Sequence, residues 1–300
     1  MSGRAMEGRV CLVTGATSGH GLAVARALAR LGAELVVHGR SAEKCKAVQA
    51  QIAAETGREP GILLADMASR ADIDRAADEV LATGRPLHVL VNNAGVVSRE
   101  REETVDGVEV TFAVNYLATF QLTLRLLERL RESAPARIVI VSSDTHRIAS
   151  LDLDDLGLRR GYNFMKAYGR SKLALVHFTR QLALRLRGSG VTVNAVDPGP
   201  VQSNIGQNNP GLTADLLKVV MRRFFKPADE ACDTAVYLAT SPEVEGVSGG
   251  YFRFMERKDP SVGRGVPDLA PRLWDLSLRM TGVREPGVAG SESETSRPRA

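Results

Sequence analysis

Seven short apolar runs alternate with segments of helical periodicity along most of this 300-residue chain. Strands are predicted at 9–15, 33–40, 61–66, 87–95, 136–143, 191–199 and 249–254. Helices are predicted at 22–32, 42–56, 71–82, 108–133, 168–188 and 228–240. Strands and helices that alternate in this way form right-handed βαβ crossovers, in which helices cover both faces of a mostly parallel sheet. The pattern therefore predicts an α/β fold, a three-layer sandwich with a Rossmann-like, doubly wound sheet of about seven strands.

The alternation is not interrupted by a linker or a short repeat, so we expect one domain over residues 1–284. Residues 285–300 are polar and rich in Gly, Ser and Pro, and this composition predicts a disordered tail. The net charge of +4 is small and the arginines are scattered along the chain. Nucleic acid is therefore not an expected partner.

The cysteines and the hydropathy favour a cytoplasmic protein. Cys11, Cys45 and Cys232 have no regular spacing, which argues against a disulfide framework and a zinc site and fits a reducing cytosol. No apolar run is long enough to span a membrane, and the leader MSGRAMEGR is too polar for a signal peptide. We therefore expect no membrane anchor.

The segment TGATSGHG (14–21) follows the first predicted strand and opens the first helix. Its glycines at 15, 19 and 21 permit a tight turn and the close approach of a diphosphate to backbone amides at the helix start. Glycines also occur in strand-to-helix turns that bind nothing. The position in the first βα unit nevertheless favours a dinucleotide site.

The end of the second strand favours NADP(H). An NAD site usually carries Asp or Glu there to bind the ribose 2′-hydroxyl, whereas this strand ends with His38, Gly39, Arg40 and Ser41. The planar guanidinium of Arg40 suits a 2′-phosphate, Ser41 could add a hydroxyl, and His38 would lie nearby. The alternative is that Arg40 is an ordinary solvated surface residue.

The motif YGRSK (168–172) places Tyr168 and Lys172 one helical turn apart on the same face. By itself, the pair is compatible with an ordinary helix surface. It is also compatible with a proton donor and the cation that tunes it, because a nearby ammonium lowers the tyrosine pKa from its usual value of about 10.

Six motifs taken together resemble the short-chain dehydrogenase/reductase family. They are TGATSGHG (14–21), NNAG (92–95), Asn115 in AVNYLATF, VSS (141–143), YGRSK (168–172) and DPGPVQS (197–203). Their order and spacing match the family over about residues 8–255. Residues 126–143, 171–201, 248–252 and a C-terminal helix at 270–282 are most similar to the retinol dehydrogenase group. The resemblance implies an NADP-dependent oxidoreductase that acts on the CH–OH group of its donor.

The resemblance also implies a cofactor site. The glycine turn would line the phosphates, the end of the third strand the adenine, and NNAG the adenosine ribose, while the DPGPVQS segment would hold the nicotinamide. The implied cofactor-binding residues, Arg40 and Ser41 included, are Gly15, Thr17, Ser18, Gly19, His20, Gly21, Arg40, Ser41, Asp66, Met67, Asn93, Ala94, Gly95, Tyr168, Lys172, Pro198, Gly199, Val201 and Ser203.

Four residues would carry the chemistry. Tyr168 is implied to be the acid in reduction and the base in oxidation, with Lys172 lowering its pKa and binding the nicotinamide ribose. Ser143 would donate a hydrogen bond to the substrate oxygen, and Asn115 would hold a water that links Lys172 to solvent. With these partners present, the active-site interpretation of YGRSK is favoured over a surface pair.

Other polar residues have simpler interpretations. For His146, a local polar role is favoured over contact with substrate. Asp152, Asp154 and Asp155 have no histidine or cysteine partner at ligand spacing, so a solvated loop is favoured over a metal site.

The substrate wall is expected from residues 143–150, the insert that ends near Met165, and residues 203–225. Their apolar content suggests a lipophilic ketone or aldehyde, or the alcohol, of retinoid, steroid or polyketide type, with carbonyl reduction as the expected direction. The alternatives are a silent NADP(H)-binding sensor or scaffold, and a C=C reductase similar to protochlorophyllide reductase. A homodimer or homotetramer could form through the predicted helices 108–133 and 168–188.

Overall fold

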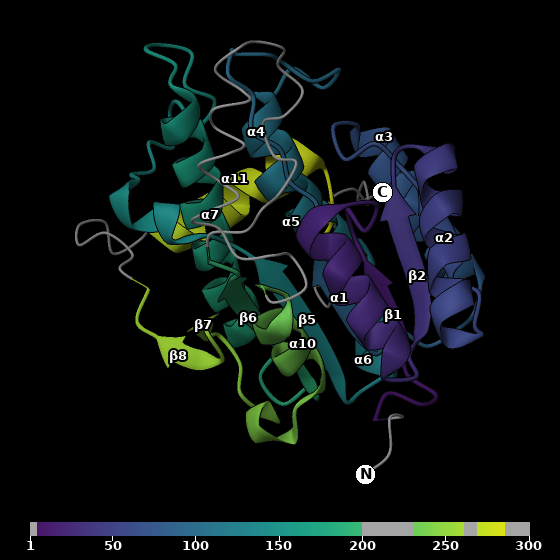
Figure 1. Ribbon diagram of the computed structural model, residues 1–300. Coiled ribbons are helices and arrows are strands. Elements are labelled where there is room, and N and C mark those ends of the chain that lie inside the picture. Colours follow the sequence, from purple (N-terminus) through teal and green to yellow (C-terminus); the bar gives the residue numbers. More distant parts are fainter. Residues whose placement is uncertain (1–4, 200–230, 261–268, 286–300) are drawn as a thin grey trace, which may run out of the picture.

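The computed structural model describes residues 5–199, 231–260 and 269–285 and has one sheet at its centre (Figure 1). The eight strands follow the order β3-β2-β1-β4-β5-β6-β7-β8, and only β8 is antiparallel to its neighbour. Their bounds are β1 Val10–Val13, β2 Glu34–Gly39, β3 Gly61–Leu64, β4 Val89–Asn92, β5 Ala136–Val141, β6 Val191–Asp197, β7 Tyr251–Arg253 and β8 Glu256–Lys258. The predicted α/β sheet is confirmed.

Helices cover both faces of the sheet, which confirms the three-layer arrangement (Figure 1). One face packs against α1 (Gly19–Arg30), α2 (Ala42–Thr56) and α10 (Asp233–Thr240). The other face packs against α3 (Arg70–Ala82), α5 (Ala118–Arg125), α6 (Leu127–Glu132), α7 (Phe164–Arg185) and α11 (Leu269–Thr281). Of the predicted helix 228–240, residues 228–230 lie outside the described residues.

The central strands are apolar throughout because each lies between two helix layers. In β1, all four side chains are buried. Leu12 packs into the core on the α3 side, whereas Cys11 and Val13 pack into the core on the α1 side. Successive strand residues point to opposite faces, so a continuous apolar run is needed to fill both cores.

The strand order reverses between β1 and β4, which are neighbours in the sheet although two strands separate them in sequence. In open α/β sheets, ligands bind in the crevice at the carboxyl ends of the strands at such a switch point. The glycine turn follows β1 and the NNAG motif spans the end of β4. The fold therefore brings these two motifs together.

The long helix predicted over residues 108–133 is present, but it is divided into four segments. A short turn, α4 (Val110–Phe112), leads into a π-helical turn, η1 (Ala113–Leu117), and then into α5 and α6. The carboxylate of Glu109 starts the first turn by accepting hydrogen bonds from the amides of Thr111 and Phe112 at 2.9 and 2.8 Å. The Thr119 hydroxyl then bonds the Asn115 carbonyl at 3.1 Å, and a side chain that competes for a carbonyl favours local widening of a helix.

Two further boundaries differ from the expectation. Helix α7 begins at Phe164 rather than at 168, because the Asn163 side chain caps the amides of Met165 and Lys166. Strand β8 is a polar edge strand without the apolar pattern that predicts strands. In addition, the described helices include none with the length and apolarity of a membrane span.

Candidate active site

The glycine turn packs so closely against the end of β4 that only glycine fits. Gly15 and Gly19 have positive φ angles of 63° and 53°. A Cβ atom on Gly21 would lie 2.4 Å from the Gly15 carbonyl oxygen and 2.3 Å from Nδ2 of Asn93. Helix α1 begins at this point, and its N-cap residue Ser18 makes no side-chain capping bond. The first amides of α1 are therefore available to an anion.

Asn93 and the buried Thr14 connect the two strand ends. The Thr14 hydroxyl accepts hydrogen bonds from the amides of Asn93 and Ala94 at 2.9 and 3.0 Å. The Asn93 side chain donates to the Thr14 carbonyl at 2.9 Å and accepts from Nδ1 of His20 at 2.9 Å. Thr14 was missed among the predicted site residues, because its role depends on a neighbour about 80 residues away in sequence.

His20 lies in the first turn of α1 with its ring buried. Burial is the main reason that its pKa lies below the usual value, so the imidazole is neutral near pH 7. The backbone of Ala231 also bonds the imidazole and partly opposes this shift.

His38 links the glycine turn to the end of β3. Its Nδ1 accepts a hydrogen bond from the Gly15 amide at 3.1 Å, so Nε2 carries the proton and donates to the Ala65 carbonyl at 3.2 Å. Burial lowers the pKa of His38 to about 4. Arg40, two residues later, is exposed, and Ser41 caps α2 through the Lys44 amide at 3.3 Å.

The end of β3 presents an exposed carboxylate. Asp66 accepts a hydrogen bond from the Ala68 amide at 2.9 Å, and its own amide donates to Asp72 at 2.9 Å. The Met67 side chain is packed in the core beside α3. Only the backbone of Met67 is therefore left for a ligand. Thr17 and Gly95 are half-buried at the same edge of the sheet.

Asn115 lies in the π-helical turn, and its side chain is fully engaged. Its Oδ1 accepts from the Val96 amide at 2.7 Å, and its Nδ2 donates to the Val96 carbonyl and to the Ser171 hydroxyl, each at 3.0 Å. Ser171 donates to the Tyr168 carbonyl at 2.7 Å. Asn115 thus joins the loop after β4 to the helix that carries Tyr168. π-helical turns are frequent at functional sites.

Tyr168, Lys172 and Ser143 converge at the carboxyl end of β5. The Lys172 ammonium lies 5.4 Å from the centre of the Tyr168 ring and donates to the Val141 carbonyl at 2.9 Å. Burial raises the pKa of Tyr168 to about 12, while a hydrogen bond with Ser143 acts in the opposite direction. Burial also lowers the pKa of Lys172 to about 8, which Asp197 partly opposes. The pair is a buried ammonium against a protonated phenol, and not a surface pair.

The turn after β6 contains the predicted Pro198 and Gly199. Gly199 has a positive φ of 75°, and its amide donates to the Asp197 carboxylate at 3.0 Å. Val201, Ser203 and the expected substrate segment 203–225 lie outside the described residues.

The remaining polar candidates have local partners. His146 is fully buried, donates a hydrogen bond from Nδ1 to the Ser143 carbonyl at 2.8 Å, and packs edge-on against Tyr251. Since the acceptor is a carbonyl, Nδ1 carries the proton. Asp152 and Asp155 accept hydrogen bonds from backbone amides of their own loop.

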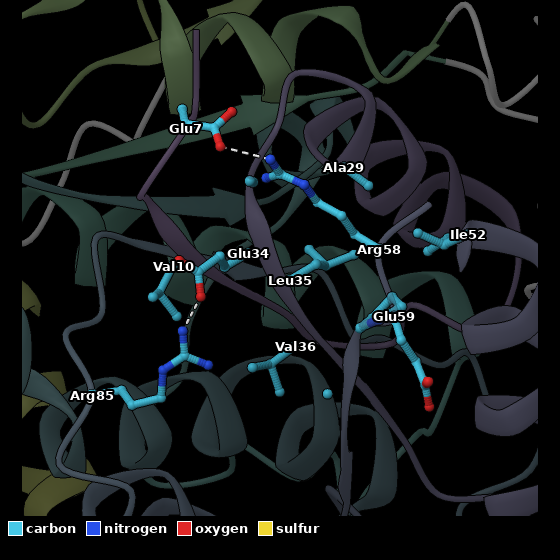
Figure 2. Close-up of a pocket in the computed structure, with 13 residues that line it drawn as sticks. Glu7, Val10, Ala29, Glu34, Leu35, Val36, Ile52, Arg58, Glu59 and Arg85 are labelled. Atoms are coloured by element: carbon cyan, nitrogen blue, oxygen red, sulfur yellow. Dashed lines mark hydrogen bonds and ion pairs between the residues drawn. The ribbon is translucent and has the colours of Figure 1, made fainter. Parts of the chain in front are cut away.

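A separate hollow of about 510 Å³ lies at the opposite, amino ends of β1, β2 and β3 (Figure 2). Two ion pairs lie among its charged side chains: Arg58 with Glu7 at 2.6 Å, and Arg85 with Glu34. The hollow shares no residue with the site at the carboxyl ends.

The chain belongs to the short-chain dehydrogenase family of nicotinamide-dependent alcohol and carbonyl oxidoreductases, whose model matches residues 9–211. Within this family it is similar to retinol dehydrogenase 14 of Homo sapiens, with 40% identity over 93% of this chain and 88% of the relative. It is also similar to polyprenol dehydrogenase of Mus musculus, with 41% identity over 92% of this chain and 84% of the relative. The expected resemblance to the retinol dehydrogenase group is confirmed.

Solved structures support the same assignment. A protein from Mycobacterium paratuberculosis is 30% identical, with a TM-score of 0.73 over 93% of this chain and 96% of that one. A short chain dehydrogenase from Burkholderia cenocepacia J2315, solved in complex with NADP, is also 30% identical, with a TM-score of 0.67 over 83% of this chain and 97% of that one.

Proposed function

We propose that this protein is an NADP(H)-dependent oxidoreductase that interconverts a lipophilic ketone or aldehyde and the corresponding alcohol, mainly by carbonyl reduction. The observation that carries the proposal is the meeting of Tyr168, Lys172 and Ser143 at the carboxyl edge of the sheet, the same edge that carries the glycine turn. The relatives named for retinol and polyprenol favour a lipophilic substrate of retinoid, steroid or polyketide type.

The residues at the carboxyl edge of the sheet fit a dinucleotide. The amides that open α1 suit a diphosphate, and the exposed guanidinium of Arg40 suits a 2′-phosphate. Asp66 suits the adenine edge, and Pro198 and Gly199 suit the nicotinamide end. The nicotinamide, when bound, supplies or takes the hydride.

The chain supplies the proton. With a pKa raised to about 12, Tyr168 keeps its proton at neutral pH and can donate it to the carbonyl oxygen of a substrate. Ser143 stabilises the developing alkoxide by hydrogen bonding, and the Lys172 ammonium stabilises the phenolate that remains. The Asn115 side chain is already engaged, so a water relay would use the second lone pair of its backbone carbonyl.

Replacing Tyr168 tests the mechanism. The Tyr168→Phe variant keeps the ring and loses the transferable proton, so kcat should fall by at least about 100-fold. NADPH affinity should change little. The measurement is NADPH oxidation with a panel of bulky ketones and aldehydes, together with NADPH binding.

Tyr237→Phe is the matched control, because Tyr237 lies on α10 and bonds Glu243 outside the site. Full activity of Tyr168→Phe would contradict the mechanism. If the wild type binds NADPH and turns over no carbonyl, the protein is a sensor or scaffold instead. Reduction of only C=C bonds would favour the protochlorophyllide reductase type.

Arg40 provides the test of cofactor preference. Arg40→Asp replaces the 2′-phosphate partner with a carboxylate that suits a ribose 2′-hydroxyl. The ratio of kcat/KM for NADPH to that for NADH should fall by at least about tenfold. Lys44→Asp, a similar charge change within the first turn of α2, is the control. An unchanged ratio in Arg40→Asp would overturn the NADP(H) preference.

We also place the protein in the cytoplasm. Cys11, Cys45 and Cys232 are present as buried thiols, and this favours a reducing compartment.

A further inference from the structure

Three charged residues converge at the ends of neighbouring strands behind Tyr168. Asp144 follows Ser143 after β5, Asp197 ends β6, and Arg253 ends β7. Asp197 and Arg253 are register partners in the parallel pair β6–β7. The adjacency of the three strands therefore brings two carboxylates and one guanidinium to one place.

Arg253 contacts both carboxylates. Its Nη1 atom donates to Oδ2 of Asp144 at 2.5 Å, and its Nε atom lies 3.4 Å from Oδ2 of Asp197. The Asp197 side chain is only 4% exposed, and its Oδ1 accepts the Gly199 amide at 3.0 Å. A buried carboxylate without a cation is costly, so Arg253 stabilises this arrangement.

We propose that Arg253 is a positioning residue, which holds the Ser143 end of β5 and the Pro198–Gly199 turn together by pairing with Asp144 and Asp197 at the same time. The inference rests on the proposed dehydrogenase function of the same site. In this role, Arg253 touches neither substrate nor cofactor. It acts through the two carboxylates.

The paired charges also contribute to the electrostatic field at Tyr168, and so to its pKa. The charge of Asp197 raises the pKa of Tyr168 and opposes the fall in the pKa of Lys172. Arg253 lies beside both carboxylates and favours their ionised forms. The arrangement of these three charged residues therefore affects the pKa of Tyr168, the proposed proton donor.

Other titratable groups face the cluster from each element around it. On the Asp144 side, Arg147 and Tyr251 bond the carboxylate at 3.1 Å each, and His146 faces it from the same 3₁₀ turn, η2 (Asp144–Ile148). On the Tyr168 side, Lys172 comes from α7, and His20 faces Lys172 from α1. None of these groups replaces Arg253, because none pairs with both carboxylates among the described contacts.

Two substitutions with opposite electrostatic sign test the proposal. Arg253→Met removes the positive charge, so the pH at which Tyr168 ionises should rise by about one unit. Asp197→Asn removes the negative charge that raises the pKa of Tyr168, with almost no change of shape, so the same midpoint should fall. A merely structural role would not move the midpoint in opposite directions.

The readouts are the pH profile of kcat/KM for alcohol oxidation and the ultraviolet titration of the Tyr168 phenolate with and without NADP⁺. Each variant is compared with its own Tyr168→Phe form, so the titration reports ionisation without turnover. Arg257→Met, on the exposed face of the same hairpin, is the control and should leave the midpoint unchanged.

Opposite shifts in the two variants support the proposal. Unchanged midpoints, or shifts in the same direction, overturn it. If Arg253→Met does not fold, Arg253→Gln takes its place, and a midpoint that stays or falls in that variant overturns the proposal. A wild-type protein that turns over no alcohol or carbonyl refutes the proposed function, while the phenolate titration still tests Arg253.

Discussion

His38 shows how one buried side chain makes the glycine turn sensitive to pH. It is 2% exposed, and its two ring nitrogens join the glycine turn to the end of β3 in a single tautomer. A protonated ring could not accept the Gly15 amide hydrogen bond. The geometry of the turn and the protonation of His38 are therefore linked.

The pH dependence of stability should report this link. Below pH of about 6.5, the unfolded chain binds a proton at His38 that the folded chain does not bind until the pH nears about 4. Stability should therefore fall as the pH decreases through this window, by about 3 kcal/mol from His38. In His38→Asn, the free energy of unfolding should fall less over the same pH range than in the wild type. Urea unfolding at a series of pH values is the measurement.

His177 provides a comparison, because burial lowers its pKa to about 4 as well. His177→Asn should also reduce the loss of unfolding free energy at acidic pH. The effects of the two substitutions should add if the two sites are independent. If wild type and His38→Asn lose the same unfolding free energy between about pH 6.5 and about pH 4, His38 does not titrate in that range.

Helix α11 is the element that completes the core on the α7 side. Its Trp274 is 2% exposed and lies edge-on to Phe120 at 5.0 Å and stacked with Phe178 at 5.8 Å. The Arg185 guanidinium covers the indole at 3.9 Å. The chain's own C-terminal helix thus covers part of the helical face through which a homodimer was expected to form.

Removing the indole should expose how much α11 contributes. Trp274→Ala should lower the free energy of unfolding by about 3–5 kcal/mol, because it leaves a cavity among aromatic rings. Circular dichroism in urea is the appropriate measurement, because Trp274 is the only tryptophan and the variant has no indole fluorescence. Asp275→Ala, at the exposed neighbouring position, should change stability by less than about 0.5 kcal/mol. Equal effects would contradict the role of α11.

At the scale of the whole molecule, the fold was largely predictable because the apolar runs of a parallel sheet are nearly continuous. Seven strands and most helices follow from that pattern. The eighth strand, Glu256–Lys258, was not predictable, because it is a polar edge strand. The turn before it is formed by Phe254 and Met255 at positive φ, without the Gly or Asn that usually indicates a hairpin.

The candidate site was predictable where one motif contains its own geometry, as in YGRSK and the glycine turn. It was not predictable where distant segments must meet. Thr14, His38 and Arg253 act on residues of other strands, so their roles depend on the sheet order and register. The bonds of the Asn115 side chain to Val96 and Ser171 likewise join segments that are 19 and 56 residues away in sequence.

Substitutions at the two ends of the sheet should affect different properties of the protein. The hollow at the amino ends of β1 to β3 is held by partly exposed ion pairs such as Arg58 with Glu7, and it shares no residue with the chemistry at the carboxyl ends (Figure 2). Substitutions there can alter robustness to heat or salt while leaving substrate choice untouched. For protein engineering, this hollow is therefore a place where thermal stability can be changed separately from catalysis.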